Sequence, residues 1–364
     1  MSNTFLTPKI IAQEALMVLE NQLTMANLVH RDYSKEFVKV GDSITIRKPA
    51  RFSAKNFTGQ VHSQNITEGS AVVKMDRFRD VTVEVGAKEL TLDIKDFSTQ
   101  VVAPALSAIA QAIDQDLLAV GIQMAAKSAT VSAKPSITDI AGVGKALDMS
   151  NAPLQNRRLV LPAEIKYKYN TLDNFAKQCY AGTSQALRDA EIGRVYTCET
   201  YSTENCPHSA ADKPGTVTEY KVTGTADDTK LNVTEGKPEA GTIAAGDQLI
   251  VNGYTYTVTD ALTLTGGAGT LKVDQNLPAD IETATPVKVI NKAHALGFHR
   301  NGIALVTRQL ELPMGASKAH IASANGLAVR VVMDYDPQTK KDTVSFDCIY
   351  GIKELDTSLL VDFS

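Results

Sequence analysis

The strongest repeating pattern of apolar residues in the chain lies between Asp96 and Lys127. Apolar side chains recur there at intervals of three or four, which places them on one face of an α-helix. They are Val102, Leu106, Ile109, Ile113, Leu117, Val120 and Met124. Ser107, Gln111, Asp114 and Gln115 lie on the opposite side, so we expect one buried and one wet face and a length of about 40 Å. Pro104 lacks an N–H, and the helix therefore kinks or begins there.

An earlier helix opens at Thr7 and Pro8, because threonine caps helices and proline fits the first helical position. Its apolar stripe ends near Met25. The stripe consists of Ile10, Ile11, Ala15, Val18, Leu19 and Leu23. Since no later helix pairs with this one, we expect an N-terminal arm that docks elsewhere.

A polar stretch, residues 51–69, lies between the strand-like segments 43–48 and 71–75. This arrangement predicts a long β-hairpin that projects from the body of the protein. Four isolated apolar residues along it are too widely spaced to form a core: Phe52, Phe57, Val61 and Ile66. Contact with a partner surface would cover them, although packing within the loop is an equally open explanation.

The middle of the chain alternates between short strands and helices. Val81, Val83 and Val85 predict a half-buried strand before the long helix. Ser136 or Thr138 caps a helix carrying Ile140, Val143 and Leu147. A buried strand follows at 156–161, stopped by a proline, then a second helix at 164–182 and a strand with a loop at 191–207.

From about Ser202 to Lys292 the chain becomes rich in Thr, Gly and Val, and helical periodicity disappears. Asn252-Gly253 between two alternating runs predicts a tight hairpin, and Gly266 to Gly269 predicts a second one. About seven short strands in this stretch indicate a β-sandwich or small barrel inserted into another domain. After it we expect a central strand at 297–313 and a long hairpin at 325–355 turning at Asp336-Pro337. Val344, Phe346, Cys348 and Tyr350 form the inner face of that hairpin. The fold class is α+β.

The bulk composition limits the function. The chain has 364 residues, a net charge of −4 and a pI near 5.9, so it carries no basic field for gripping nucleic acid. The N-terminus is not a signal peptide, and no apolar run approaches the ~20 residues of a membrane span. We therefore expect a cytoplasmic product whose cysteines, Cys179, Cys198, Cys206 and Cys348, are free thiols.

A search for catalytic or metal chemistry gives no strong candidate. Cys198, Cys206 and His208 could supply three zinc ligands, but a fourth is missing and the spacing fits no standard finger. His294 and His299 lie near no nucleophile pattern. Asp114 and Asp116 face different directions on a helix, and one can be buried against an arginine. Arg47-Lys48 and Arg157-Arg158 are too short for a nucleic-acid patch and favour solvated surface. We expect no enzyme, metal or cofactor, and a protein that contacts copies of itself.

Several segments resemble the coat proteins of short-tailed phages, which carry an immunoglobulin-like domain inserted into the tailed-phage capsid fold. The opening, TPKIIAQEALMVLENQLTMANLVHRDYSKEFVKVGDSITIRKPARFSA, is similar to their N-terminus, and KELTLDIKDFSTQVVAPALSAIAQAIDQDLL to their strand and spine helix. APLQNRRLVLP, IGRVYTCETYSTENCP and GFHRNGIALVTRQLELP resemble their apical and peripheral strands. The sequence departs from the pattern at Thr197, where glycine is expected after the IGR turn.

The resemblance implies a major capsid protein with the Johnson fold, shared by tailed-phage capsids and the floor of herpesvirus capsids. It implies an N-terminal arm (1–49), an extended loop (50–75), a peripheral domain with the spine helix (76–130), an apical domain (131–201 and 294–325), an inserted β domain (202–293) and C-terminal strands (326–364). Pro104 would then be a bend that adjusts during shell maturation.

The same resemblance implies the assembly and its partners. Hexamers and pentamers would form an icosahedral shell in the host cytoplasm, with a scaffolding protein, a portal protein and packaged DNA held without specific binding. The location would be the virion, with no membrane. The alternatives are a nanocompartment shell of the same fold, a carbohydrate- or cell-surface-binding protein acting through the β insert, and an enzyme.

Overall fold

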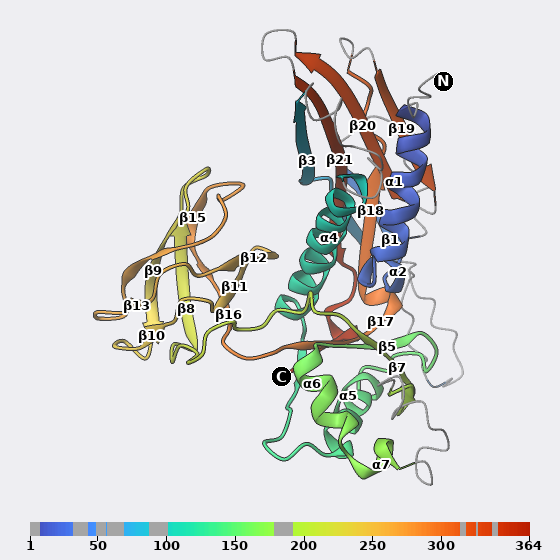
Figure 1. Ribbon diagram of the computed structural model, residues 1–364. Coiled ribbons are helices and arrows are strands. Elements are labelled where there is room, and N and C mark those ends of the chain that lie inside the picture. Colours follow the sequence, from blue (N-terminus) through green and yellow to red (C-terminus); the bar gives the residue numbers. More distant parts are fainter. Residues whose placement is uncertain are drawn as a thin grey trace. The chain divides into compact units, whose positions relative to one another are not determined.

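The computed structural model describes residues 8–31, 43–48, 56, 69–86, 101–177, 192–313, 318–324, 327–336 and 341–364. The chain divides into two compact units (Figure 1). Unit 1 comprises residues 1–23, 30–110 and 304–355, and unit 2 comprises residues 24–29, 111–303 and 356–364.

Unit 1 is built on an antiparallel sheet. Its neighbouring strands are β19 (Lys318–Ala324), β20 (Leu327–Asp336) and β21 (Lys341–Glu354), and β21 also pairs with β3 (Arg77–Gly86) and β18 (Ile303–Arg308). The predicted C-terminal hairpin is therefore confirmed, with its turn outside the described residues. The four inner-face residues Val344, Phe346, Cys348 and Tyr350 are each at most 1% exposed, as their alternation predicts.

Helix α1 (Pro8–Gln22) packs on β19 and β20 (Figure 1). Its start at Pro8 is as predicted, and Ile11, Ala15, Leu19 and Leu23 are at most 3% exposed. The expectation that this helix docks elsewhere is wrong, because its apolar stripe covers the chain's own sheet. Sequence periodicity could not show this, since the strands that the helix covers lie some 300 residues later in the chain.

A two-stranded ribbon joins this core. Strands β1 (Ser43–Lys48) and β2 (Gly69–Lys74) pair antiparallel, with Lys48 opposite Gly69, which confirms the base of the predicted projecting hairpin. Ile46, Ala71 and Val73 share a buried cluster with Ala304, Val306 and Leu355. A Cβ at Gly351 of β21 would overlap the carbonyl of Lys74, so only glycine permits the two strands to approach so closely.

Helix α4 (Ala103–Gln123) is the long helix that the pattern predicts, at 21 residues or about 32 Å. Pro104 lies in its first turn, where a missing N–H costs nothing. Helix α4 therefore begins one residue before this proline, after a π-helical Val101 and Val102; residues 87–100 lie outside the described part. Contrary to expectation, α4 is long and apolar enough to span a membrane, but 72% of its most apolar window is buried in the protein, as in a core helix.

The core of unit 2 is a six-stranded sheet. The order of its strands is β4 (Lys127–Ala129), β22 (Leu360–Phe363), β17 (Ala295–His299), β5 (Arg157–Leu161), β7 (Cys198–Ser202) and β6 (Arg194–Val195). β5 is the predicted buried strand. The prediction of a single central strand at 297–313 is wrong. A 3₁₀ turn, Arg300–Gly302, separates β17 from β18 in this segment. His299 caps this turn by accepting the N–H of Asn301.

Helices cover this sheet. Helix α5 (Ile137–Asp148) begins after Ser136, one of the two caps that the sequence allowed, in a capping box with Asp139. The second predicted helix is two short ones, α6 (Ala163–Asn170) and α7 (Asp173–Ala176). Two contacts join the layers: a Cβ at Gly297 would overlap Val143 of α5, and the rings of Tyr169 and Phe363 stack with centroids 6.0 Å apart. A 3₁₀ turn, Thr357–Leu359, leads into β22.

The inserted segment forms its own sheets, drawn in yellow and orange in Figure 1. Four strands pair in the order β14 (Gly269–Lys272), β9 (Lys230–Lys237), β8 (Glu219–Gly224) and β15 (Ile281–Pro286). Three pair as β12 (Tyr254–Thr257), β11 (Gln248–Val251) and β16 (Lys288–Ile290), and two as β10 (Thr242–Ile243) and β13 (Leu262–Thr263). The sheets share one apolar core, which includes Val222, Leu231, Leu249 and Leu271, as expected for an all-β sandwich-like unit.

The two glycine-marked hairpins have different outcomes. Asn252 and Gly253 have φ of 51° and 79° between β11 and β12, the tight turn that the sequence predicts. Gly266 and Gly267 also have positive φ, in a turn closed by Thr265 and Ala268. The flanking strands of this second turn do not form a ladder, because β13 pairs with β10 and β14 with β9.

Candidate interaction surface

The predicted contact residues Phe52, Phe57, Val61 and Ile66 lie outside the described residues. The structure describes only the antiparallel base of their hairpin, formed by β1 and β2. Their contacts with a partner therefore stay a prediction.

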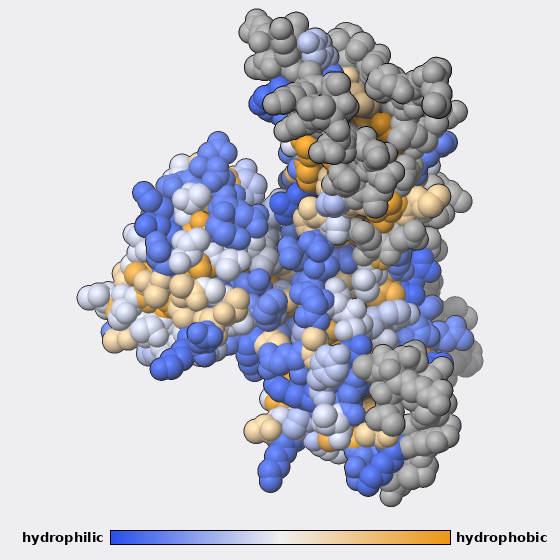
Figure 2. Space-filling model, viewed as in Figure 1, coloured by the Kyte–Doolittle hydropathy of each residue, from blue (hydrophilic) through white to orange (hydrophobic). Residues whose placement is uncertain are grey.

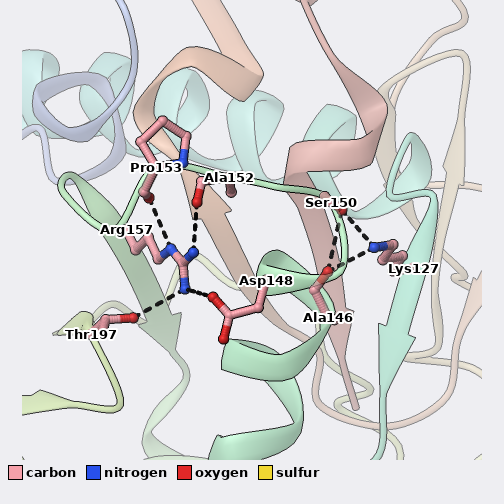
Figure 3. A network of polar contacts seen from close by, with 8 residues as sticks. All are labelled: Lys127, Ala146, Asp148, Ser150, Ala152, Pro153, Arg157 and Thr197. Atoms are coloured by element: carbon pink, nitrogen blue, oxygen red, sulfur yellow. Dashed lines mark hydrogen bonds and ion pairs between the residues drawn. The ribbon is translucent and has the colours of Figure 1, made fainter. Parts of the chain in front are cut away.

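Arg157, the first residue of β5, is the centre of a buried polar network (Figure 3). It is 2% exposed, so the expectation of a solvated Arg157 is wrong. Its guanidinium donates to the carbonyls of Ala152 at 2.7 Å and Pro153 at 2.9 Å, and to the Thr197 hydroxyl at 3.2 Å. It also forms an ion pair with Asp148 at 2.7 Å. One side chain thus joins the end of α5, the loop before β5 and the turn before β7.

A second contact set fixes the end of α5. The ammonium of Lys127 donates to the carbonyl of Ala146 at 2.7 Å and to the hydroxyl of Ser150 at 2.5 Å (Figure 3). That hydroxyl lies 2.6 Å from the carbonyl of Ser358. A lysine at a helix C-terminus satisfies carbonyls that have no partner within the helix and interacts favourably with the helix dipole. Lys127 and Ser150 therefore cap the C-terminal end of α5, and the hydroxyl of Ser150 is directed at the backbone carbonyl of Ser358.

The backbone around Arg157 is left-handed at four residues other than glycine. Asn151 and Asn156 have φ of 53° and 57°, and Tyr196 and Thr197 have φ of 44° and 71°. A β-branched residue rarely takes this conformation, which explains why glycine is expected at position 197. The Thr197 hydroxyl accepts from Arg157, a contact that glycine could not make.

The segments that Arg157 joins also expose large apolar side chains. Met149 is 72% exposed, Leu154 is 59% exposed and Tyr196 is 49% exposed. We call the loop 149–156 together with the turn Tyr196–Thr197 the Arg157 rim. Single exposed apolar residues are normal; these three lie on segments that the hydrogen bonds and the ion pair of Arg157 hold together.

On the face drawn in Figure 2, hydrophilic residues dominate the coloured surface, with smaller hydrophobic areas between them. The apolar areas on this face are therefore small and separate.

The carboxyl of Asp362 on β22 joins the insert to the central sheet of unit 2. It lies 2.7 Å from the ammonium of Lys288 on β16 and 2.8 Å from Nδ1 of His294. Burial raises its pKa, but the hydrogen bonds and charges of His294 and Lys288 outweigh burial and lower the pKa overall. Burial and the positive charge of Arg157 lower the pKa of His299. Neither histidine faces a nucleophile among the contacts described.

The cysteines of the described residues lie in the interior of the protein. Cys198, Cys206 and Cys348 are free and buried, as predicted, and burial raises the pKa of all three thiols, that of Cys348 to about 12. Such thiols are poor nucleophiles and poor metal ligands. Within the described ranges no group of three or more His, Cys, Asp and Glu side chains could bind a metal ion.

Asp114 on α4 is fully buried and contacts a helix end instead of an arginine. Its carboxylate accepts the N–H groups of Thr24 at 2.8 Å, Met25 at 3.0 Å and Ala26 at 3.2 Å, at the start of α2 (Met25–Leu28). Sequence reasoning placed Asp114 on the wet face. The clue was the almost continuous apolar run from Leu117 to Ile122, which predicts a helix end buried on all sides.

Comparison with solved structures identifies the fold. The chain is similar to a structure from Mycobacterium phage Che8, with a TM-score of 0.57 and 14% sequence identity over 94% of this chain and 91% of that one. It is also similar to the capsid of Cyanophage P-SCSP1u (TM-score 0.50, 13% identity, 90% and 84% covered) and to the mature capsid of bacteriophage PhiM1 (TM-score 0.50, 9% identity, 89% and 82% covered). No protein-family model matches the sequence, and no curated protein sequence matches it.

The chain therefore has the α+β fold of tailed-phage capsid proteins, over nearly its whole length. The expected resemblance to phage coat proteins is confirmed at the level of the fold. That the insert is specifically immunoglobulin-like is not confirmed.

Proposed function

We propose that this chain is the major capsid protein of a tailed phage, which assembles as hexamers and pentamers into an icosahedral shell around double-stranded DNA. The observation that carries the proposal is the match of its fold to phage structures over 90–94% of this chain and 84–91% of theirs. A fold alone does not define a function. The buried thiols, and the histidines that contact Asp362 and Asn301, do not point to a catalytic or metal-binding function instead.

The domain assignment belongs to the same proposal. Residues 1–49 are the N-terminal arm, 50–75 the extended loop, 76–130 the peripheral domain, 131–201 and 294–325 the apical domain, 202–293 the insert and 326–364 the C-terminal strands. The separate sheets and core of the insert support its boundaries.

Two surfaces are proposed for contact between copies. The first is the extended loop with Phe52, Phe57, Val61 and Ile66. The second is the Arg157 rim, whose exposed Met149, Leu154 and Tyr196 gain from burial because a rigid surface loses little conformational entropy on association. A scaffolding protein and a portal protein are the proposed partners during assembly in the host cytoplasm. The net charge of −4 suits a shell that does not bind its DNA tightly.

The direct test is negative-stain electron microscopy of the full chain, produced alone and together with a scaffolding protein. We expect closed shells of uniform diameter. Monomers and small oligomers under both conditions would contradict the proposal, and saturable glycan binding by that unassembled protein would favour a binding protein that acts through its insert. Shells that enclose enzymes and no DNA would favour a nanocompartment.

The contact surfaces are tested separately. Deletion of residues 52–69 is expected to leave a folded subunit that forms no shells. Met149→Ser with Leu154→Ser is expected to reduce shell yield while the circular dichroism spectrum stays unchanged, because both side chains are exposed. Lys145→Ser, an exposed change on the neighbouring helix α5, is the control. Normal assembly of either variant would remove that surface from the proposal.

A further inference from the structure

The turn between β11 and β12 exposes one of its two central residues and buries the other. Asn252 is exposed and Gly253 is buried, and their φ values of 51° and 79° are both left-handed. Among the described residues, no hydrogen bond involves the side chain of Asn252. Its carboxamide is therefore open to water, beside a residue that has no side chain.

An asparagine followed by glycine is prone to spontaneous deamidation, because no Cβ hinders attack by the next backbone nitrogen on the carboxamide carbon. In such a pair, hydroxide removes the proton of the glycine nitrogen, which then forms a bond to Cγ of the asparagine. The bond from Cγ to Nδ2 breaks, and Nδ2 leaves as ammonia after taking a proton from water. Water opens the resulting cyclic imide to aspartate or isoaspartate, so the net reaction consumes a water molecule and releases ammonia.

The attacking nitrogen is engaged in this structure. Gly253 donates its N–H to Oε1 of Gln123 at 2.7 Å, and Gln123 is the half-buried last residue of α4. Both residues belong to unit 2. The nitrogen must give up this hydrogen bond and its proton before it attacks Cγ, so the Gln123 carboxamide opposes the first step of the reaction.

We propose that Asn252 is a site of spontaneous deamidation and that Gln123 controls its rate. While the Gln123 carboxamide accepts from Gly253, the reaction is slow, and when this contact is lost, the reaction accelerates. Water is the only co-reactant, and it reaches the exposed Asn252 directly. The inference goes beyond the proposed function and does not depend on shell assembly.

Both products alter the hairpin. Aspartate adds a negative charge at the turn, and isoaspartate adds a carbon atom to the backbone between β11 and β12. A two-residue turn fixes the register of its strands, here with Val251 opposite Tyr254. The longer backbone of isoaspartate disturbs this register, and with it the burial of Leu249 and Tyr256 in the core of the insert. Loss of the Gln123 contact thus leads to a permanent chemical change in the insert.

The test is to incubate the unassembled full-length chain in mildly alkaline buffer and to follow its tryptic peptides by mass spectrometry. Conversion of Asn252 is measured as the mass gain of an acid that replaces an amide, together with isoaspartate. Gln123→Leu, which removes the acceptor, is expected to accelerate this conversion about 5-fold. Gln123→Glu, which keeps an acceptor oxygen, is expected to stay within about 2-fold of the wild type. Gln115→Leu, an exposed change on the same helix, is the matched control and is expected to keep the wild-type rate.

A second Asn-Gly pair is the internal reference. Asn301-Gly302 lies in the 3₁₀ turn between β17 and β18, and Asn301 is exposed and Gly302 buried, as in the first pair. Conversion of Asn301 is expected to be the same in all variants, because the Gln123 contact does not involve it.

Equal conversion of Asn252 in the wild type and in Gln123→Leu would overturn the proposal. Acceleration of Asn252 and Asn301 to the same extent would also overturn it, because the cause would be a general loss of structure instead of the loss of one hydrogen bond. The wild type alone gives a further measurement: its Asn252 is expected to convert at least about 5-fold more slowly in the folded chain than in the chain unfolded in urea. Equal rates in these two states would overturn the proposal even if Gln123→Leu failed to fold.

Discussion

Replacing Arg157 with methionine keeps most of the side-chain volume in the core and removes all four of its polar contacts. The Asp148 carboxylate, 62% exposed, and the carbonyl of the exposed Pro153 become hydrated, and each contributes at most about 1 kcal/mol. Ala152 is only 7% exposed, and an unpaired buried carbonyl costs about 1–3 kcal/mol. With the Thr197 hydroxyl included, we expect Arg157→Met to lower the free energy of unfolding by about 2–4 kcal/mol.

The measurement is urea unfolding of the unassembled chain, followed by far-UV circular dichroism. Because two units can unfold separately, hydrogen exchange of residues 145–161 identifies the transition that belongs to unit 2. Asp148→Asn is expected to cost less than about 1 kcal/mol, and Arg194→Met, an exposed arginine on β6, less than about 0.5 kcal/mol. An Arg157→Met loss as small as that of Arg194→Met would refute the role given to the network.

Three smaller predictions concern packing, and thermal and urea unfolding of the full chain measure each of them. The buried hydroxyl of Tyr220 has no hydrogen-bond partner among the described residues, so Tyr220→Phe is expected to be neutral or to stabilise by up to about 1 kcal/mol. A loss of stability of more than about 1 kcal/mol would contradict this expectation. A Cβ at Gly297 would overlap Val143, so Gly297→Ala is expected to lower the free energy of unfolding by about 1–3 kcal/mol. At Gly142 the nearest atom to an added Cβ is 3.9 Å away, so Gly142→Ala is expected to stabilise α5 by up to about 1 kcal/mol. Equal effects of the two alanines would contradict this. Gly253→Ala places a side chain at a φ of 79° and is expected to cost about 1–2 kcal/mol, and no measurable cost would contradict the turn assignment.

Local patterns predicted much of the secondary structure. The capping box at Ser136, the proline at the start of α1 and the Asn252-Gly253 turn each depend on groups a few residues apart. The inner face of β21 follows from strict alternation, because strand side chains point to opposite faces in turn. The resemblance to phage coat proteins led us to expect glycine at position 197, and Thr197 does take the left-handed conformation that glycine favours.

Errors arose where partners lie far apart in the sequence. Arg157 lies on the same face of β5 as the buried Leu159 and Leu161, so the alternation along this strand does indicate its burial. The groups that accept its hydrogen bonds, however, come from three separate segments of the chain. Asp114 was assigned to a wet face because its partner, the start of α2, precedes it by some 90 residues. The expected pairing of β13 with β14 failed because each strand found a partner elsewhere in the insert.

The sequence by itself determined the α+β class, the long helix, the β-rich insert and the resemblance to phage coat proteins, because periodicity and turn residues act over a few positions. Only the tertiary structure decided that α1 covers its own sheet, that one predicted strand is divided between two sheets, and that buried Asp114 and Arg157 bind backbone groups. Burial and hydrogen bonding between distant segments decide such questions, and neither is recorded in any local pattern of residues.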